Sequence, residues 1–451
     1  MAMSKRNAWL ILSLGILILL SFADCKDDSP SDTDSSVSED ATAPQAVADL
    51  RVQSIVGGLV TLAWTAPGDD GDSGTASVYD IRYSSSAVTE GTWAGCTQAS
   101  TEPDPAAAGT EQYAIIDTGG GMTFYFALKT SDEVPNWSGL SNVVVAPMQG
   151  TFVVHQLTSD GTNNHPCVDD GYVTWVRYTY EDGYEIYIAN LENASPTPTG
   201  LTDNDSEKRH PNNHGSERIV WQQRETSIAD WEIWIYDKYA AIRYSQFTDN
   251  EVDDTYPDLS SAGSFAWLQG HILHESVHYW NEYGHSESVL SNDCCPTSEW
   301  YCHYLSADAS GVVWRAYDRV DSGGPRAYLW NGTLTDITDI IDANLTTRYI
   351  LYEGTLAYQY GTDDPPMIAY WDGDTVHDVG RGYEPSLYDG TVAFLVYDGD
   401  WEIRYWDGMI VQEITDNDFD DFDLSLHGSF IVWEGRPGGG PGQIFYVDVT
   451  E

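Results

Sequence analysis

Two groups of residues have the types and spacing of metal sites. The first is the segment His274-Glu275-Ser276-Val277-His278, which has the HExxH pattern. In zinc proteases, both histidines of this pattern bind the metal and the glutamate acts as the base. That chemistry requires a helix, because only there do residues four apart share one face at bonding distance. Whether the two histidines can bind one zinc ion therefore depends on whether the surrounding segment is a helix.

The second group lies close by and mixes thiols with imidazoles. Its members are His271, His274, Cys294, Cys295 and Cys302. Thiolates and a histidine could hold zinc, but the spacing lacks the paired CxxC of known zinc sites. In an oxidising compartment, a disulfide between Cys302 and one cysteine of the adjacent pair is the favoured interpretation.

A third group consists of aspartates in predicted turns. These are Asp203, Asp205, Asp249, Asp253, Asp254, Asp416, Asp418, Asp420 and Asp421. Clustered carboxylates suit Ca²⁺, yet the EF-hand pattern fails: counting from Asp416, the sixth position is Asp421 instead of Gly and the twelfth is His427 instead of Glu. Two interpretations stay open, a loose Ca²⁺ or ligand-binding surface and turn formers that bond their own backbone. No other cofactor is predicted.

Other catalytic patterns are absent from the sequence. It contains no Gly-rich phosphate loop with its lysine, no GxSxG nucleophile elbow and no sialidase-type box. The sequence therefore predicts no catalytic residues, although scattered carboxylates could still form a catalytic site.

The elements that position these groups come from an internal repeat. An aromatic residue that follows an apolar run recurs at spacings of 46, 46, 47, 44, 36 and 39 residues. The seven positions are Trp175, Trp221, Trp267, Trp314, Tyr358, Phe394 and Trp433. Each is followed by an alternating strand such as Glu232 to Asp237, and most repeats contain an apolar-Thr-Asp-Asn turn or a variant of it. A period near 40 with four short strands is typical of a propeller blade.

The positions of X-Pro and Asp-Gly pairs in the repeat resemble those of the TolB-type propeller family. The matching pairs are His165-Pro166, His210-Pro211, Tyr256-Pro257, Glu384-Pro385 and Asp389-Gly390. The resemblance implies an all-β propeller over residues 151–451. The repeat itself predicts seven blades, with six as the alternative. The chain enters at Thr151 to Leu157 as a lone fourth strand and ends after a third strand, so we expect both termini to complete one blade.

The repeat also assigns the HExxH segment to a strand. Its register places His278 opposite Glu232, because 278 minus 232 is 46, on the third strand of a blade. Residues four apart in a strand are about 13 Å apart and cannot share one zinc. We therefore do not expect a metalloprotease. The register also places the aspartate turns and the cysteine group on one loop face.

The N-terminus has the features of an export signal. Lys5 and Arg6 precede an apolar run from Ala8 to Ala23, which is too short to span a bilayer and is followed by Cys25. Residues 1–25 resemble a bacterial lipoprotein signal, which implies lipidation of Cys25. Residues 26–43 are acidic and nearly free of apolar side chains, so we expect a disordered tether.

Residues 44–147 form a separate predicted module. Strand patterns at Leu59 to Trp64, Tyr79 to Tyr83 and Phe124 to Lys129 alternate with period two. With Trp64 as the core tryptophan, this stretch resembles a bacterial fibronectin type III domain, which implies a β-sandwich acting as a spacer.

The charge limits the choice of partners. The 71 acidic and 20 basic side chains give a formal charge of -51, which repels nucleic acid and anionic headgroups. We expect an exported binding protein of the cell envelope, at the outer surface or in the periplasm. Its only membrane contact would be a lipid anchor, and its partner would be a protein or an envelope polysaccharide. The alternatives are a carbohydrate-active hydrolase or lyase with carboxylates at the propeller mouth, and a structural surface component.

Overall fold

The computed structural model describes residues 40–120, 122–147, 152–240, 243–260, 263–271, 274–293, 300–318, 326–339, 348–361 and 363–450. The described chain is all-β, with three short 3-10 turns as its helical elements. Within these ranges, no helix is long and apolar enough to cross a membrane. The predicted export signal, Cys25 and most of the tether lie outside the described residues.

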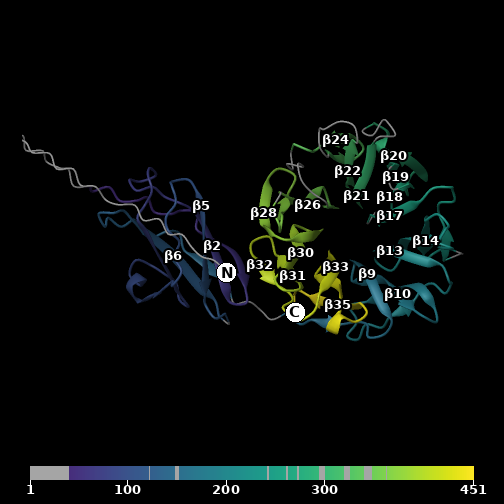
Figure 1. The fold of residues 1–451 in the computed structure, drawn as a ribbon, viewed down its shortest axis with the longest axis horizontal. Coiled ribbons are helices and arrows are strands. Elements are labelled where there is room, and N and C mark those ends of the chain that lie inside the picture. The colour runs from purple at the N-terminus through teal and green to yellow at the C-terminus, as the bar shows by residue number, and fades with distance from the viewer. Residues whose placement is uncertain are drawn as a thin grey trace, which may run out of the picture. The chain divides into compact units, whose positions relative to one another are not determined.

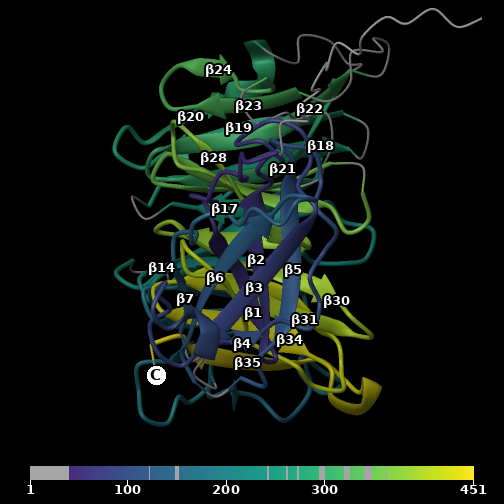
Figure 2. The same ribbon diagram turned by 90° about the vertical axis from the view of Figure 1, so that its left-hand side faces the viewer.

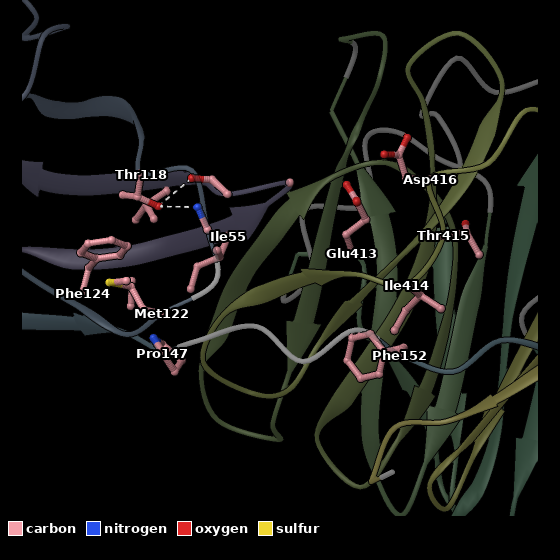
Figure 3. A pocket seen from close by; sticks show the side chains of 15 residues that line it. Ile55, Thr118, Met122, Phe124, Pro147, Phe152, Glu413, Ile414, Thr415 and Asp416 are labelled. Carbon is pink, nitrogen blue, oxygen red and sulfur yellow. Dashed lines mark hydrogen bonds between the residues drawn. The ribbon is translucent and has the colours of Figure 1, made fainter. Parts of the chain in front are cut away.

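The N-terminal module consists of two antiparallel sheets that share one core. The first has the order β1 (Arg51–Val56), β2 (Leu59–Thr65), β5 (Glu111–Asp117); the second has the order β4 (Thr97–Gln98), β3 (Val78–Ser84), β6 (Phe124–Ser131), β7 (Val144–Ala146) (Figure 2). Trp64 and Tyr79 meet edge to face in this core, with ring centroids 5.1 Å apart, and both are buried. Figure 3 shows how the connection after β5 is held, where the Thr118 hydroxyl donates to the Gly58 carbonyl at 2.8 Å.

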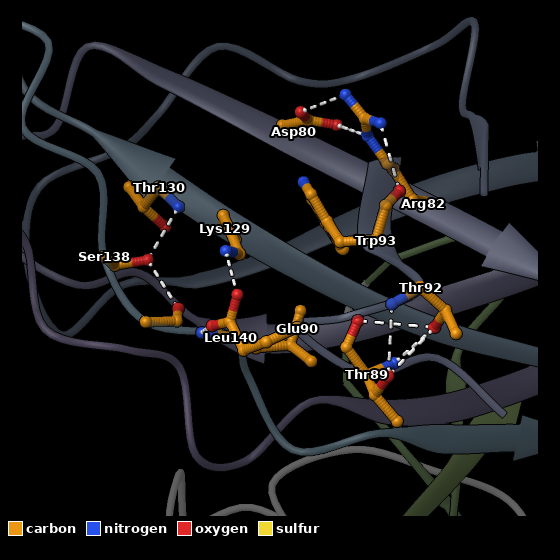
Figure 4. A network of polar contacts seen from close by, with 11 residues as sticks. Asp80, Arg82, Thr89, Glu90, Thr92, Trp93, Lys129, Thr130, Ser138 and Leu140 are labelled. Carbon is orange, nitrogen blue, oxygen red and sulfur yellow. Dashed lines mark hydrogen bonds and ion pairs between the residues drawn. The ribbon is translucent and has the colours of Figure 1, made fainter. Parts of the chain in front are cut away.

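A polar network covers one side of this module (Figure 4). The cationic groups of Arg82 and Lys129 lie 5.0 and 5.3 Å from the ring centroid of Trp93. Lys129 also pairs with Glu90 at 2.6 Å, and Glu90 accepts the backbone N–H of Leu140. The network ties the segment before Trp93 to the strand β6 and to the chain that leads to β7.

The described residues from His155 onward form six four-stranded antiparallel sheets and a further set of four antiparallel strands between Tyr383 and Glu413, which a parallel pair of Ser54 with Val411 joins to β1 in a seven-stranded sheet. The first is β9 (Thr162–Asp169), β10 (Tyr172–Thr179), β11 (Gly183–Asn190), β12 (Thr199–Gly200); the second is β13 (Glu207–His214), β14 (Arg218–Arg224), β15 (Glu232–Asp237), β16 (Tyr244–Gln246). The third is β17 (Asp254–Leu259), β18 (Phe265–His271), β19 (His274–Asn281), β20 (Ser286–Val289); the fourth is β21 (Trp300–Asp308), β22 (Gly311–Asp318), β23 (Arg326–Trp330), β24 (Leu334–Asp336). The fifth is β25 (Tyr349–Tyr352), β26 (Thr355–Tyr360), β27 (Met367–Trp371), β28 (Val376–Arg381); the sixth is β29 (Tyr383–Tyr388), β30 (Thr391–Tyr397), β31 (Trp401–Trp406), β32 (Val411–Glu413). The seventh is β33 (Asp421–His427), β34 (Phe430–Gly435), β35 (Gln443–Asp448) and β8 (His155–Gln156).

The repeated aromatic residues are the anchors of these sheets. All seven lie on the second strand of a sheet and are at most 2 % exposed. Three of the indoles donate a hydrogen bond to the start of the first strand: Trp175 to Asn163 at 2.8 Å, Trp267 to Asp254 at 2.7 Å and Trp433 to Asp421 at 2.8 Å. In these three sheets the repeat therefore places a buried tryptophan beside the acceptor that satisfies its N–H.

The sheets close into a ring. Each first strand contacts the first strand of the next sheet, and β33 contacts β9, so the seven first strands form a complete cycle. In Figure 1, β9, β13 and β21 lie nearer the middle of the ring than β10, β14 and β22 do. The predicted joining of the two ends of the repeat region is confirmed, because β8 pairs with β35 through Gln156 and Phe445.

Side chains reinforce this closure between neighbouring first strands. Five of them accept a backbone N–H from the next sheet: Asn212 from Leu259 (3.0 Å), Asp258 from Ala307 (2.8 Å), Ser306 from Leu351 (3.1 Å), Ser386 from Leu426 (3.0 Å) and Ser425 from Val168 (3.2 Å). First strands are sheet edges, and their N–H groups would otherwise lack ladder partners. Small polar residues at one repeated position therefore hold the sheets together.

The HExxH segment lies on the strand β19, as the repeat predicts, but the predicted register is wrong by two residues. Trp267 pairs with His278, whereas the equivalent Trp221 pairs with Trp234. His278 is therefore equivalent to Trp234 and not to Glu232. The reason is the connection between the second and third strands, which is two residues shorter in the third sheet.

Candidate functional site

The first strands of five sheets are interrupted at the same place by a residue with left-handed backbone. These residues are His165, His210, Tyr256, Glu384 and Asp423, with φ between 48° and 52°. In each case the strand pairing is interrupted at this residue, and proline follows in all but Asp423. Left-handed backbone is unfavourable for residues other than glycine. Its recurrence at one position of the ring indicates that the fold uses it to direct these side chains.

The side chains at this position meet across sheet boundaries. The rings of His165 and His210 have centroids 4.4 Å apart, and those of His210 and Tyr256 are 4.8 Å apart. On the other side, His165 Nδ1 lies 3.2 Å from Asp423 Oδ2. Arg348, just before β25, forms an ion pair with Glu384 at 3.0 Å. The charge of Arg348 also lowers the pKa of Asp423, so this ion pair belongs to the same group of side chains. We call these six residues the central cluster.

The protonation states of the central cluster follow from its geometry. Burial, together with the neighbouring charge of His165, lowers the pKa of His210 to about 3, so this imidazole is neutral at physiological pH. Burial acts to raise the pKa of Asp423, but the hydrogen bond from His165 and the charges of His165 and Arg348 hold it below its usual range. The cluster therefore presents a neutral imidazole beside the His165–Asp423 hydrogen bond and the Arg348–Glu384 ion pair, with Tyr256 52 % exposed.

Neighbouring sheets hold the backbone of the cluster in place. The N–H of Tyr256 donates to Gln222 Oε1 at 2.9 Å, and the N–H of Glu384 donates to Gln359 Oε1 at 2.9 Å. Both glutamines directly follow the repeated aromatic of the preceding sheet. The cluster is therefore preorganised by the ring, which is what a binding site requires.

A second polar group lies at the other end of the first strands. Asp169 binds two histidines at once: Oδ2 lies 3.1 Å from His214 Nδ1, and Oδ1 lies 2.9 Å from His427 Nε2. His427 Nδ1 accepts the N–H of Asp170, so the proton of this imidazole is on Nε2 and is donated to Asp169. The Tyr388 ring packs against His427 with centroids 4.3 Å apart.

The electrostatics of this second group centre on Asp169. Burial acts to raise its pKa, but the hydrogen bonds from both histidines hold it well below the usual range. The hydrogen bond to Asp169 in turn raises the pKa of His214. A histidine oriented by a carboxylate can bind a ligand or transfer a proton.

The predicted aspartates fall into two sets. Asp254 and Asp421 are fully buried and bind tryptophan indoles, while Asp253 and Asp420 accept the N–H groups of Trp231 and Trp401 at 3.0 and 3.2 Å. The exposed set comprises Asp203, Asp205, Asp249, Asp416 and Asp418. Figure 3 shows one such turn, with Thr415 and Asp416 after β32. The buried set bonds to other segments and not to the backbone of its own turn, and both interpretations of the predicted aspartates remain predictions.

The candidate metal ligands of the third and fourth sheets remain a prediction. Cys294 and Cys295 lie outside the described residues. His271, the last residue of β18, is the ladder partner of His274, the first residue of β19. The side chains of both histidines lie outside the described part of the structure. Cys302 is buried on β21.

Sequence reasoning missed the central cluster. The sequence feature that marks the cluster is a His-Pro, Tyr-Pro or Glu-Pro pair, which recurs ten or eleven residues before the repeated aromatic. In the sequence these pairs predict only turns. Nothing in a single sequence shows that the residue before each proline turns toward the others.

The chain was compared with known proteins in three ways. No family model matches it, and no curated protein matches its sequence. Among solved structures, it is similar to the β-propeller domain of the Trilobed protease from Pyrococcus furiosus, with 12% identity, a TM-score of 0.47, and coverage of 64% of this chain and 95% of that one. It is also similar to TolB from Acinetobacter baumannii, with 12% identity, a TM-score of 0.39, and coverage of 73% and 77%. A third is a catalytically inactive virginiamycin B lyase from Staphylococcus aureus, with 11% identity, a TM-score of 0.43, and coverage of 66% and 99%.

Proposed function

We propose that this chain is an exported binding protein, in which a seven-bladed β-propeller binds a protein or an envelope polysaccharide. In this proposal residues 44–147 form a fibronectin type III spacer, and a lipid on Cys25 anchors the chain to the envelope. The observation that carries the proposal is the central cluster, where five sheets direct polar and aromatic side chains to one place.

The chemistry of the central cluster favours binding. The adjacent rings of His165, His210 and Tyr256 offer flat faces on which a sugar or an aromatic side chain can pack. Arg348 uses one guanidinium nitrogen on Glu384 in the ion pair, and its fork geometry leaves further N–H donors for a ligand. Together these groups suit a ligand with both apolar faces and hydrogen-bonding groups.

The carboxyl groups are poorly placed for acid catalysis by a glycosidase. Burial raises the pKa of Glu402 and Asp421 to about 7, as a general acid needs, but both are 0 % exposed and out of reach of a substrate. Asp423 is accessible, but its depressed pKa keeps it ionised at neutral pH. This contrast supports binding over hydrolysis by paired carboxylates.

A panel of envelope polysaccharides and short peptides, screened against the full-length protein, tests the proposal. We expect a saturable interaction that Tyr256→Ala weakens at least tenfold. Tyr180→Ala is the matched control, because Tyr180 is 96% exposed and outside the cluster. Equal loss in both variants, or binding unchanged in Tyr256→Ala, would contradict the assignment to the cluster. Fractionation of a Cys25→Ser variant tests the anchor separately.

A carbohydrate-active hydrolase or lyase is the second candidate, and the Asp169–His214 pair favours it. Asp169 orients the imidazole of His214 as a general base requires. Incubation with the same polysaccharides, followed by detection of new reducing ends or unsaturated products, separates the two functions. Turnover that His214→Gln abolishes would replace the binding proposal.

A further inference from the structure

A partly exposed tryptophan stands at one repeated position in the second and sixth sheets. Trp231 and Trp401 each lie three residues before the residue of the third strand that pairs with the repeated aromatic. An aspartate of the following turn accepts the backbone N–H of each, Asp253 at 3.0 Å and Asp420 at 3.2 Å. The fold therefore holds two accessible indoles in equivalent places.

In the sixth sheet, the tryptophan continues the central cluster as a row of aromatic rings. The ring of Trp401 meets two tyrosines edge to face, Tyr383 with centroids 5.1 Å apart and Tyr397 with centroids 5.3 Å apart. Tyr383 directly precedes Glu384 of the central cluster, and Tyr397 is 59 % exposed. We call Tyr383, Trp401 and Tyr397 the sixth-sheet track. It leads from the cluster on the first strand to an exposed ring at the end of the second.

In the second sheet, the equivalent tryptophan is flanked by two cations. The guanidinium groups of Arg209 and Arg224 lie 5.3 and 4.5 Å from the ring centroid of Trp231. Both arginines also pair with Glu207, at 2.6 and 2.5 Å. Arg209 directly precedes His210 of the central cluster. We call Arg209, Trp231 and Arg224 the second-sheet track, and it starts beside the cluster as the sixth-sheet track does.

The chemistry of the two tracks favours a sugar over a protein. They consist of aromatic rings and guanidinium groups without any aliphatic side chain, whereas the buried core of a protein interface is mainly apolar. Flat rings with hydrogen-bonding groups at their edges match a sugar, which has an apolar face and a rim of hydroxyls. The arginines of the second-sheet track already pair with Glu207, and the formal charge of -51 repels polyanions, so the sugar is uncharged.

We infer that the two tracks extend the central cluster into a binding surface for a linear, neutral polysaccharide of flat β-linked sugars. This inference rests on the proposed function and selects the polysaccharide from its two classes of partner. The sugar chain would cross from the sixth sheet over the central cluster to the second sheet. Each track adds contacts only to a chain that is long enough to reach it, so affinity should rise with chain length.

Calorimetric titration of the full-length protein with cello-oligosaccharides and chito-oligosaccharides of increasing length tests this inference. We expect the affinity to rise at least tenfold from the shortest oligosaccharide that binds to the longest. Tyr397→Ala should remove part of this gain and leave the shortest oligosaccharide unaffected, because that ligand occupies the central cluster alone. Tyr239→Ala is the matched control and should change neither affinity. Tyr239 is 73 % exposed and follows the end of β15, whereas Trp231 precedes its start.

A pair of variants tests the second-sheet track in the same titration. Trp231→Ala should likewise weaken the binding of long oligosaccharides and spare the shortest. Trp231→Phe keeps a flat ring at this position and should recover most of the lost affinity. Circular dichroism and the urea unfolding midpoint establish that each variant is folded.

The outcomes separate this inference from the proposed function. Affinity that does not depend on chain length, with Tyr256→Ala still weakening binding, would overturn the inference and leave the proposed function standing. Peptide binding without any oligosaccharide binding would have the same meaning. An equal loss at every length in folded Tyr397→Ala protein would also overturn the inference, because the track would then not act on long chains alone. Tighter binding of oligogalacturonates than of neutral chains of the same length would refute the exclusion of polyanions.

Discussion

The imidazole rings of His165 and His210 lie 4.4 Å apart, although they belong to different sheets and are separated by a whole repeat. The contact exists because both residues take a left-handed conformation at the same point of their first strands. A strained position that recurs around a ring directs side chains to the centre, where they can act on a common ligand.

Removing the Arg348–Glu384 pair should affect binding more than folding. Both side chains are more than a third exposed, so their ion pair contributes little to stability, at most about 1 kcal/mol. We expect Glu384→Gln to leave the urea unfolding midpoint nearly unchanged while the affinity for the ligand changes severalfold. A large drop in the midpoint, with affinity preserved in the folded fraction, would show a structural role instead.

The stability contribution of Asp169 and His214 should depend on pH in a bell-shaped manner. The pKa of Asp169 is depressed in the folded state, so its contribution is present above the unfolded value of about 4 and is lost as pH falls. The pKa of His214 is raised, so its contribution is complete below about pH 6.5 and declines as pH rises through the folded value. The pair should therefore stabilise the fold most between about pH 4 and 6.5.

Comparing wild type with Asp169→Asn by urea unfolding at several pH values checks this expectation. The variant should lose roughly 1–3 kcal/mol inside that window and less on either side, since Asp169 also accepts the N–H of Gly215. A difference that stays constant from acidic to alkaline pH would contradict the assigned ionisation states.

The bond between Trp175 and Asn163 should be essential to the first sheet. Both side chains are fully buried, and Asn163 Nδ2 also donates to the Asp160 carbonyl at 2.7 Å. Asn163→Leu should destabilise the protein by roughly 2–4 kcal/mol, because it leaves the indole N–H and a backbone carbonyl unsatisfied. Asn163→Asp keeps the acceptor found in the third and seventh sheets and should cost less. The order of the two unfolding midpoints is the measurement, and a reversed order would contradict this account.

Ser386 and Ser425 should each contribute to ring closure. Their hydroxyls accept the N–H groups of Leu426 and Val168, two different contacts of the seventh sheet. We expect each alanine variant to cost about 1 kcal/mol. Hydrogen exchange should accelerate at the amide whose acceptor is lost, and acceleration at neither amide would show that these bonds do not hold the ring.

The repeat made much of the fold predictable. Buried aromatics such as Trp221 recur at nearly constant spacing, and the unpaired strands at the two ends indicated how the ring closes. The HExxH segment could be assigned to a strand for the same reason. Its register was misjudged because spacing between aromatics does not report the length of the turn after them, and that turn differs by two residues in the third sheet.

The candidate site was far less predictable. The acidic composition of the turns predicted a ligand-binding surface. The side chains of Asp254 and Asp421 are instead buried and accept hydrogen bonds from tryptophan N–H groups. The central cluster draws single residues from separate repeats, and each alone resembles an ordinary residue before proline. Only the closed ring brings His165 beside both His210 and Asp423, since Asp423 lies at the opposite end of the repeat region.

The most direct test of the central claim is the affinity of the full-length protein for its ligand when His210 is changed to alanine, with Tyr180→Ala as the surface control. The ring of His210 lies between those of His165 and Tyr256, so its removal breaks the aromatic surface at its middle. We predict at least a tenfold loss of affinity, with circular dichroism and the unfolding midpoint close to wild type and no loss in the control. Unchanged affinity in folded His210→Ala protein would contradict the assignment of binding to the central cluster.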